Sequence, residues 1–401
     1  MKRVVRISIV LLISLGVVLG VVKLRRSSHA NNKASIANQN NLVVHEWGTF
    51  TSIAGKDGVA LEWRPLNGSI DLPKFVHTMQ QEGLGLRHSQ TKAELTALVR
   101  METPVLYFYS SREMNVSAEV NFPKGKITEW YPQARSVGST INWGNFKVSP
   151  GAAFNLPADY SDNHYYAARE TDAAPVQVCG SSGKAAEQEK FLFYRGVGSF
   201  DLPLSAKLNS QQIELKNTTK DPISSLIVFE NRGGKIGYQV VNYFTGQKTT
   251  ERPALDDNID SVIRDLKQTL IASGLYDKEA DAMIKTWRNS WFEEGLRVFY
   301  VLPRKTTDEV LPISINPSPT QLVRVLVGRT ELITPEMEKA VRKQVSLLSD
   351  ASPKVREEAR MEIQRRGRFA EPILKHMLDD ETEPAMRARI KQTIASVSRT
   401  D

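Results

Sequence analysis

The chain has 401 residues, which is enough to bury two hydrophobic cores. Its formal net charge is +8, but residues 1–33 contain seven basic residues and no acidic one, so 46 basic and 45 acidic residues remain in the rest. Nucleic-acid binding needs a clustered basic surface that neutralises phosphates. The near-neutral body excludes this class, and we expect no nucleic-acid partner.

An apolar leader opens the chain. Residues 7–22 are 16 uncharged, mostly aliphatic residues between "MKRVVR" and "KLRRSS". This pattern is typical of a signal peptide or a membrane anchor, and residues 1–26 form this segment. The run is longer than the apolar region of most signal peptides and shorter than the roughly 20 residues that span a bilayer, so both alternatives stay open. Basic residues after the run favour the uncleaved anchor, and those before it predict a body outside the cytoplasm.

A polar stretch follows the leader. Residues 27–41 are rich in Asn and Ser and have little to bury, which predicts a flexible stalk. Cys179 is the only cysteine of the chain, so no intrachain disulfide can form. The body must therefore be held together by its hydrophobic core.

The body, residues 42–333, is predicted to be mainly β, an antiparallel β-sandwich. Short runs rich in Val, Ile, Phe, Tyr and Trp end at Gly, Pro, Asn or Asp, and in "VSAEVNF" the apolar residues alternate with polar ones. Gly233-Gly234 between two such runs predicts a hairpin turn. One helix is expected within 89–103, where apolar residues recur at helical spacing before Pro104.

Two helices are predicted at about 255–295. Apolar stripes run through "LDDNIDSVIRDLKQTLIASG" and "DKEADAMIKTWRNSWFEEG", and each segment ends at a glycine. We expect an αα-hairpin inserted into the β-domain, because strand-like runs return in "LRVFYVLP" and "QLVRVLVGRTEL". The Pro-rich "LPISINPSPTQ" between them predicts an irregular crossover.

Helices are predicted for the end of the chain, residues 334–401. Apolar residues recur at helical spacing in "SPKVREEARMEIQRRG", "FAEPILKHMLDD" and "EPAMRARIKQTIASVS", and over residues 345–397 this spacing resembles HEAT-like helical repeats. Such repeats bury their faces only against neighbours, and the resemblance implies protein contacts rather than catalysis. We expect residues 345–397 either to dock a protein partner or to cap the β-domain.

The body also resembles a family of exported bacterial proteins. The shared segments are "HEWGTFTS", "METPVLYFYS", "ITEWYPQAR", "FLFYRGVG" and "WFEEGLRVFYVLP", from His45 to about Leu332. The resemblance implies a bacterial, exported protein and assigns no activity, cofactor or catalytic residue. With the leader, it predicts attachment to the bacterial inner membrane, with the body in the periplasm or outside the cell.

Candidate site residues concentrate near the start of the body. Strand alternation puts His45 and Glu46 on opposite faces, so they do not form one catalytic pair. A zinc-type site would combine His45 with histidines from elsewhere, and the sequence offers His77, His88 and His164. None of them has the spacing of a known metal motif, so structural or surface histidines are the alternative.

Carboxylates and tryptophans supply the remaining candidates. Catalysis by paired acids would use His45, Glu46 or Glu102, with Glu62 and Glu129 as further carboxylates beside apolar residues. Trp47, Trp63 and Trp130 would bind a sugar ring by stacking, unless they fill the core. No phosphate-binding glycine loop or G-x-S-x-G sequence is present.

The sequence therefore predicts a membrane-anchored envelope protein with a binding or scaffolding role. The alternative is an envelope or extracellular hydrolase, with or without a metal ion, acting on carbohydrate or another cell-surface polymer. A common pocket that gathers His45, Glu46, His77, His88 or Glu102 would favour the hydrolase, and their dispersal would favour binding.

Overall fold

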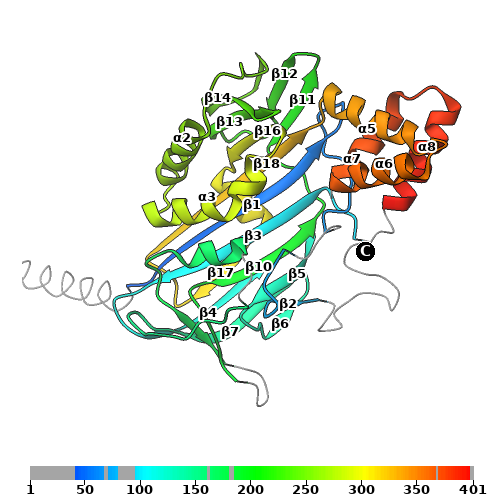
Figure 1. Cartoon of the computed structure of the whole chain (residues 1–401). Coiled ribbons are helices and arrows are strands. Elements are labelled where there is room, and N and C mark those ends of the chain that lie inside the picture. The colour runs from blue at the N-terminus through cyan, green and yellow to red at the C-terminus, as the bar shows by residue number, and fades with distance from the viewer. Residues whose placement is uncertain are drawn as a thin grey trace, which may run out of the picture.

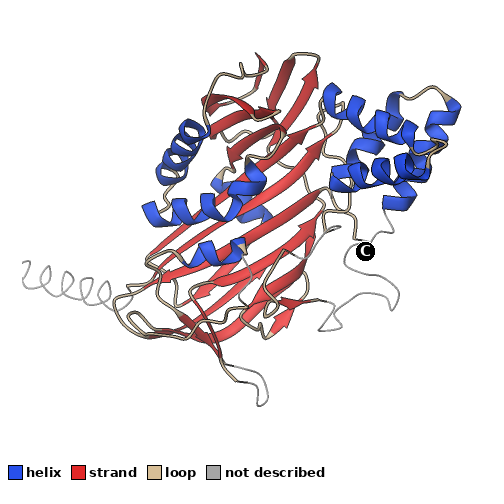
Figure 2. Cartoon of the chain, in the orientation of Figure 1, coloured by secondary structure: helices blue, strands red, loops and turns tan. Residues whose placement is uncertain are grey.

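A computed structural model of the chain describes residues 41–66, 71–79, 95–159, 163–179, 185–366 and 369–397. It is rich in strands, with helices on one face and at one end (Figures 1 and 2). None of the helices in these ranges is long and apolar enough to cross a bilayer. The predicted leader, residues 1–26, and nearly all of the predicted stalk lie outside the described residues.

A nine-stranded sheet forms the centre of the molecule. Its strands, in spatial order, are β14 (Lys235–Phe244), β13 (Ile223–Arg232), β16 (Gly295–Val301), β18 (Gln321–Leu332), β1 (Val43–Ala54), β3 (Val99–Tyr109), β10 (Leu192–Gly198), β5 (Gly125–Tyr131) and β2 (His77–Thr78). The pair β1–β18 is parallel over all 12 residues of each strand, whereas the other pairs are antiparallel. The sheet is therefore mixed, and its long parallel pair lies in the middle.

Two smaller antiparallel sheets share an apolar core with one face of the large sheet. One consists of β11 (Leu204–Asn209), β12 (Gln212–Asn217) and β15 (Gln247–Glu251). The other contains β17 (Ile313–Asn316), β4 (Met114–Asn121), β7 (Thr140–Val148), β8 (Val176–Val178) and β9 (Glu187–Glu189), with β6 (Ser136–Val137) beside β7. Their buried side chains, such as Val116, Ala118 and Ile213, lie in one cluster with Val44 and Phe108 of the large sheet.

Helices cover the other face of the large sheet. The helices α2 (Ile259–Ala272) and α3 (Asp277–Trp291) form the predicted hairpin, and the 3-10 helix η2 (His164–Arg169) lies against α3. Their apolar stripes, including Leu266 and Met283, pack on Trp47, Tyr107 and Phe299 of the sheet. Figure 2 shows these helices together in front of the strands. Strand alternation decides the layer of each side chain, because successive residues face opposite sides.

The four C-terminal helices pack on the end of the sheet where β1 and β18 finish. They are α5 (Pro335–Leu347), α6 (Pro353–Arg365), α7 (Ala370–Asp380) and α8 (Pro384–Val397). Their core includes Ile53 at the end of β1 and Trp63, whose ring stacks on Phe369 with centroids 5.9 Å apart. Helices at this end of the chain were predicted from the sequence, and Figure 1 shows them gathered beyond the sheet.

Local predictions held at some positions and failed at others. Gly233 and Gly234 both have positive φ and join β13 to β14, so the predicted hairpin turn is confirmed. The helix predicted for 89–103 is wrong in its described part, because residues 99–103 belong to strand β3 between β1 and β10. The Pro-rich crossover contains the short strand β17, which pairs with β4. The short helix α4 (Arg304–Val310), which follows β16, was not predicted.

Candidate functional site

His45 and Glu46 face opposite layers, as the alternation of β1 requires. His45 lies under α3, and its ring centroid is 4.4 Å from that of Tyr276, just before the helix. Glu46 contacts Tyr194 and Arg324 in the layer next to the smaller sheets. Because the sheet separates the two side chains, each belongs to its own polar cluster.

The first cluster is built around Glu279 of α3. Its Oε2 lies 2.8 Å from His45 Nδ1 and accepts the backbone N–H of Tyr276 at 2.7 Å, while its Oε1 accepts the hydroxyl of Tyr109 at 2.7 Å. His45 and Glu279 are fully buried. A carboxylate can only accept here, so Nδ1 carries the proton of this hydrogen bond. Nε2 has no hydrogen-bond partner.

The Tyr109 hydroxyl shows the effect of this buried carboxylate. Burial, together with the charge of Glu279, raises the pKa of Tyr109 far above its usual value. Tyr109 therefore stays a neutral donor at every physiological pH. The cluster ties β1, β3 and α3 together, and it also has the carboxylate–imidazole arrangement that orients a general base.

The second cluster joins Glu46 to Arg324 of β18. Arg324 Nε donates to Glu46 Oε2 at 2.6 Å and Nη1 donates to Asp308 Oδ1 at 2.9 Å, while the Tyr194 hydroxyl donates to Glu46 Oε1 at 2.6 Å. Burial alone would lower the pKa of Arg324, but the charge of Glu46 raises it above its usual value. This is a charged pair with its main hydrogen bonds made, which is the arrangement of a structural ion pair.

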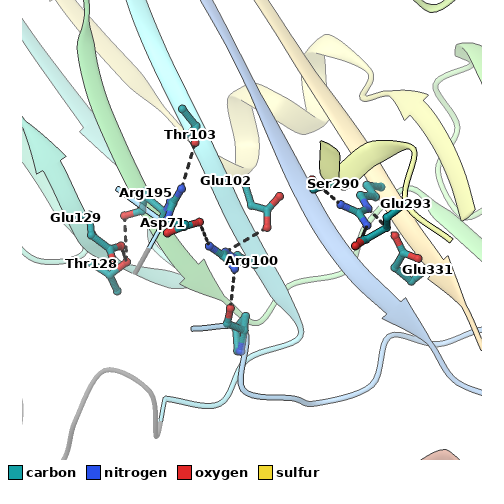
Figure 3. Close-up of polar contacts among 12 residues, drawn as sticks. Asp71, Arg100, Glu102, Thr103, Thr128, Glu129, Arg195, Ser290, Glu293 and Glu331 are labelled. Atoms are coloured by element: carbon teal, nitrogen blue, oxygen red, sulfur yellow. Dashed lines mark hydrogen bonds and ion pairs between the residues drawn. The ribbon is translucent and has the colours of Figure 1, made fainter. Parts of the chain in front are cut away.

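A third polar region lies across the helix-covered face of the large sheet (Figure 3). Asp71 accepts from Arg195 Nη1 at 2.7 Å and from Arg100 Nη2 at 3.1 Å, and Arg100 Nε lies 3.2 Å from Glu102. Burial alone would raise the pKa of Asp71, but the guanidinium groups of Arg195 and Arg100 lower it well below its usual range. Glu102, fully buried, sits between these arginines and Arg329 of β18.

The other end of this region is centred on Glu331. Its carboxylate pairs with Arg297 and Arg329. Arg329 also donates to Glu293 at 2.8 Å and to Ser290 Oγ at 3.1 Å, and Figure 3 shows Ser290, Glu293 and Glu331 close together at this end. Burial alone would raise the pKa of Glu331, but the two arginines lower it. A row of matched charges therefore crosses several strands, at high desolvation cost.

His164 approaches this region from η2. Burial and then the charge of Arg195 lower the pKa of His164 to about 4, against the opposing charges of Asp71 and Glu102. Its ring lies 5.2 Å from that of Trp287 in α3, and its Nε2 has no hydrogen-bond partner. His164 is therefore a neutral imidazole at pH 7, next to a group of buried charges.

The histidines proposed as metal ligands do not converge in the described part. His77 Nε2 lies 2.9 Å from Glu187 and its ring stacks near Trp130, far along the sheet order from β1. His88 lies outside the described residues. Over the ranges that the structure describes, no group of three or more His, Cys, Asp or Glu side chains could hold a metal ion.

The tryptophans proposed as a sugar platform are all buried. Trp47, Trp63 and Trp130 have no exposed surface. Trp47 packs under the helices, Trp63 against the C-terminal helices and Trp130 in the layer of the smaller sheets. Stacking on a sugar would require the surrounding side chains to move.

Several residues of these clusters were not identified from the sequence, namely Asp71, Arg195, Glu279, Arg324, Arg329 and Glu331. The sequence does indicate two of them. Arg195 and Arg324 are each a charged residue inside an apolar run, "FLFYRGVG" and "QLVRVLVG". A charge at such a position needs a buried partner. Nothing in the sequence indicates Glu279, since an acid in the first turn of a helix is ordinary.

Comparisons with protein-family models and with curated proteins found no match to this chain. The interpretation of function therefore depends on the leader, the fold and the clusters above.

Proposed function

We propose that this protein is anchored in the bacterial inner membrane, with its body in the periplasm or outside the cell, and acts by binding or scaffolding. Its C-terminal helices would dock a protein partner. The leader and the resemblance to the exported family support the location. The observation that best supports this role is the position of the two ends of β1. One end lies where the described part of the chain begins, and the other lies at the C-terminal helices.

The long parallel pair places these two points at opposite ends of the body. The described part of the chain begins at residue 41. The carbonyl of Leu42 accepts a hydrogen bond from the backbone N–H of Thr320, which lies just before β18. The 12 residues of β1 then extend about 35 Å at roughly 3.3 Å per residue. Its last residues meet the helices through Ile53. Figure 1 shows the start of β1 and the C-terminal helices at opposite ends of the described body. An anchor before residue 41 would therefore present the helices away from the membrane.

The helices are held firmly on this end. Besides the Trp63–Phe369 stack, Arg252 donates to Glu336 of α5 at 3.1 Å and also pairs with Glu230 of β13. Lys375 of α7 donates to the backbone carbonyl of Glu62 at 3.2 Å. A scaffold needs such a rigid connection, because a loosely tethered docking segment would lose affinity to ordering entropy.

The dispersal of the candidate catalytic residues also supports binding over hydrolysis. His45, Glu46 and Glu102 each lie in a different buried cluster, with ionic partners of their own. We further infer that the large and the two smaller sheets are the layers of a β-sandwich, and that the four C-terminal helices are HEAT-like repeats.

The proposal is tested by photocrosslinking in living cells with the full chain. A photoreactive amino acid is placed at Lys354, whose side chain is 85% exposed, or at Met361, 47% exposed, both on α6. The control position is Tyr243 on the edge strand β14, 73% exposed. We expect one discrete adduct from the α6 positions and none from position 243. Identical adduct patterns, or no adduct from α6, would contradict docking by these helices.

The second candidate function, a hydrolase acting on carbohydrate or another cell-surface polymer, is favoured by the His45–Glu279 pair. In a neutral imidazole, its unpartnered Nε2 would be the acceptor that a general base requires. The test is release of soluble fragments from purified cell-wall polymer by the full chain in detergent, with and without added Zn²⁺. Loss of this activity in His45→Ala, with activity kept in His77→Ala, would support the hydrolase.

A further inference from the structure

A groove of about 870 Å³ opens between α2 and the large sheet, at the end of β16. Its walls come from β13, α2 and the segment that leads from β16 into α4, and its lining includes Ser224, Ser225, Asp265, Lys305 and Arg324. The groove lies at the opposite end of β18 from the C-terminal helices. Its size falls within the range of small-molecule and peptide sites.

The groove exists because β16 is shorter than its neighbours. Its last pairs are Tyr300 with Leu226 of β13 and Val301 with Val327 of β18. The chain then turns into α4. Residues 223–225 of β13 therefore have no strand partner on the side of β16. Residues 322–325 of β18 likewise pair with β1 on one side and with no strand on the other. Two strand edges therefore face each other across the width that one strand would fill, about 10 Å.

These edges are open to an added strand. Open edges carry unpaired backbone N–H and C=O groups, which extended peptides bind by strand addition. One carbonyl is already used, because Arg304 Nη1 donates to Leu322 O at 2.9 Å. The remaining length of about three residues fits a short segment rather than a long strand.

One buried polar side chain of the lining lacks a partner. The hydroxyl of Ser225, a residue only 7% exposed, has no hydrogen bond. Buried polar groups are normally satisfied, so this hydroxyl points to a ligand with a polar group beside it. The guanidinium of Arg324 is fully buried beside Glu46 and Asp308, so this residue reaches the groove only through its backbone.

The charges of the lining limit that ligand. The positive charges of the lining are balanced by nearby carboxylates. Asp221 and Asp265 lie in the groove itself, and Glu46 and Asp308 pair with Arg324 and Arg304. These carboxylates would repel a ligand with several negative charges. A single carboxylate suits the arginine and lysine side and leaves the rest of the ligand neutral.

We propose that this groove binds a short extended peptide, three or four residues long, which adds as a strand between β13 and β18 and places its free C-terminal carboxylate at Lys305. Backbone pairing supplies affinity for many sequences, and the carboxylate fixes the direction of the peptide. This site is independent of the docking proposed for the C-terminal helices.

The test uses the full chain in detergent and a mixed pool of tetrapeptides with free carboxyl ends. Binding is detected by saturation-transfer NMR, and the affinity of a recovered peptide is measured by calorimetry. The groove variant is Ser224→Trp, which fills the groove from an exposed strand position. Its matched control is Ser314→Trp, on an exposed position of β17 outside the groove. Far-UV circular dichroism checks that both variants are folded.

We expect saturable binding that Ser224→Trp weakens at least tenfold and Ser314→Trp leaves unchanged. Amidation of the peptide carboxyl end and Lys305→Ala should each weaken binding, amidation by roughly tenfold as expected for loss of a charge-assisted bond. No saturable binding of the pool, or equal affinity in both tryptophan variants, overturns the site. Equal affinity of the acid and the amide overturns the assignment of the carboxylate.

Discussion

The guanidinium of Arg324 and the carboxylate of Glu46 form an ion pair with both side chains fully buried and an Nε–Oε2 distance of 2.6 Å. Removing one partner of such a pair leaves an uncompensated charge. We expect Glu46→Gln to lower the free energy of unfolding by about 3 kcal/mol, measured by urea unfolding of the full chain in detergent. Glu309→Gln, at an exposed position of α4, is the control and should change it by less than about 0.5 kcal/mol. Equal effects of the two would show that the pair is not a major source of stability.

Glu279 joins three elements, and its loss should affect all of them. Glu279→Ala deprives His45 Nδ1, the Tyr109 hydroxyl and the Tyr276 N–H of their shared acceptor. A buried donor left unpaired costs about 1–3 kcal/mol, and the donors of Tyr109 and Tyr276 are only partly buried, so we expect a total loss of about 3 kcal/mol. Asp281→Ala, on the same helix, removes only the partly exposed contact with Lys267. Its effect on urea unfolding should stay below about 1 kcal/mol, and a larger effect than that of Glu279→Ala would refute the central role of Glu279.

His164 predicts a pH dependence of stability. Its pKa is about 4 in the folded protein and 6.5 in the reference state, so the unfolded chain takes up a proton that the folded chain refuses. The contribution of neutral His164 to the free energy of unfolding is fully present above pH 6.5. It is lost as the pH falls toward 4, and the loss is at most about 3 kcal/mol. Asp71, whose pKa is lowered, acts below this window.

The variant His164→Phe keeps an aromatic ring beside Trp287 and removes the titration. Between pH 6.5 and 4 its free energy of unfolding should fall less steeply than that of the wild type, whereas the two curves should run parallel above pH 7. Parallel curves over the whole range would mean that His164 titrates normally in the fold.

Gly328 leaves room for a tyrosine on the neighbouring strand. It pairs with Tyr300 across β16 and β18, and a Cβ at position 328 would lie 2.1 Å from Tyr300 Cζ. We expect Gly328→Ala to lower the melting temperature and to cost about 2 kcal/mol or more, because the ring must leave its position in the core. Gly138→Ala, where a Cβ meets nothing within 4 Å, is the control.

A second substitution separates this clash from a backbone effect. In the double variant Gly328→Ala with Tyr300→Leu, the loss should be smaller than the sum of the two single losses. Strict additivity would show that the tyrosine ring is not the cause.

Short-range patterns of residues in the sequence predicted much of the fold. The period-two pattern identified β4, the glycine pair identified the turn between β13 and β14, and apolar stripes ending at glycine identified α2 and α3. These features depend on neighbours within a few residues. The segment before Pro104 misled the prediction, since its helical spacing of apolar residues was overridden by pairing with β1 and β10.

The candidate site was predicted only in part. Alternation along β1 was enough to separate His45 from Glu46, because the direction of a side chain in a strand follows from its position alone. The partner of each was beyond the sequence: Glu279 is 234 residues from His45 and Arg324 is 278 residues from Glu46.

By itself, then, the sequence determined a strand-rich body with a helical hairpin and a helical end, since hydrophobic periodicity and turn residues act locally. Only the tertiary structure decided that β1 and β18 lie parallel, that buried arginines face buried carboxylates, and that β16 stops short and opens a groove. These outcomes arise from contacts between distant segments, where the burial of a charge is tolerated only if its partner comes from another strand or helix.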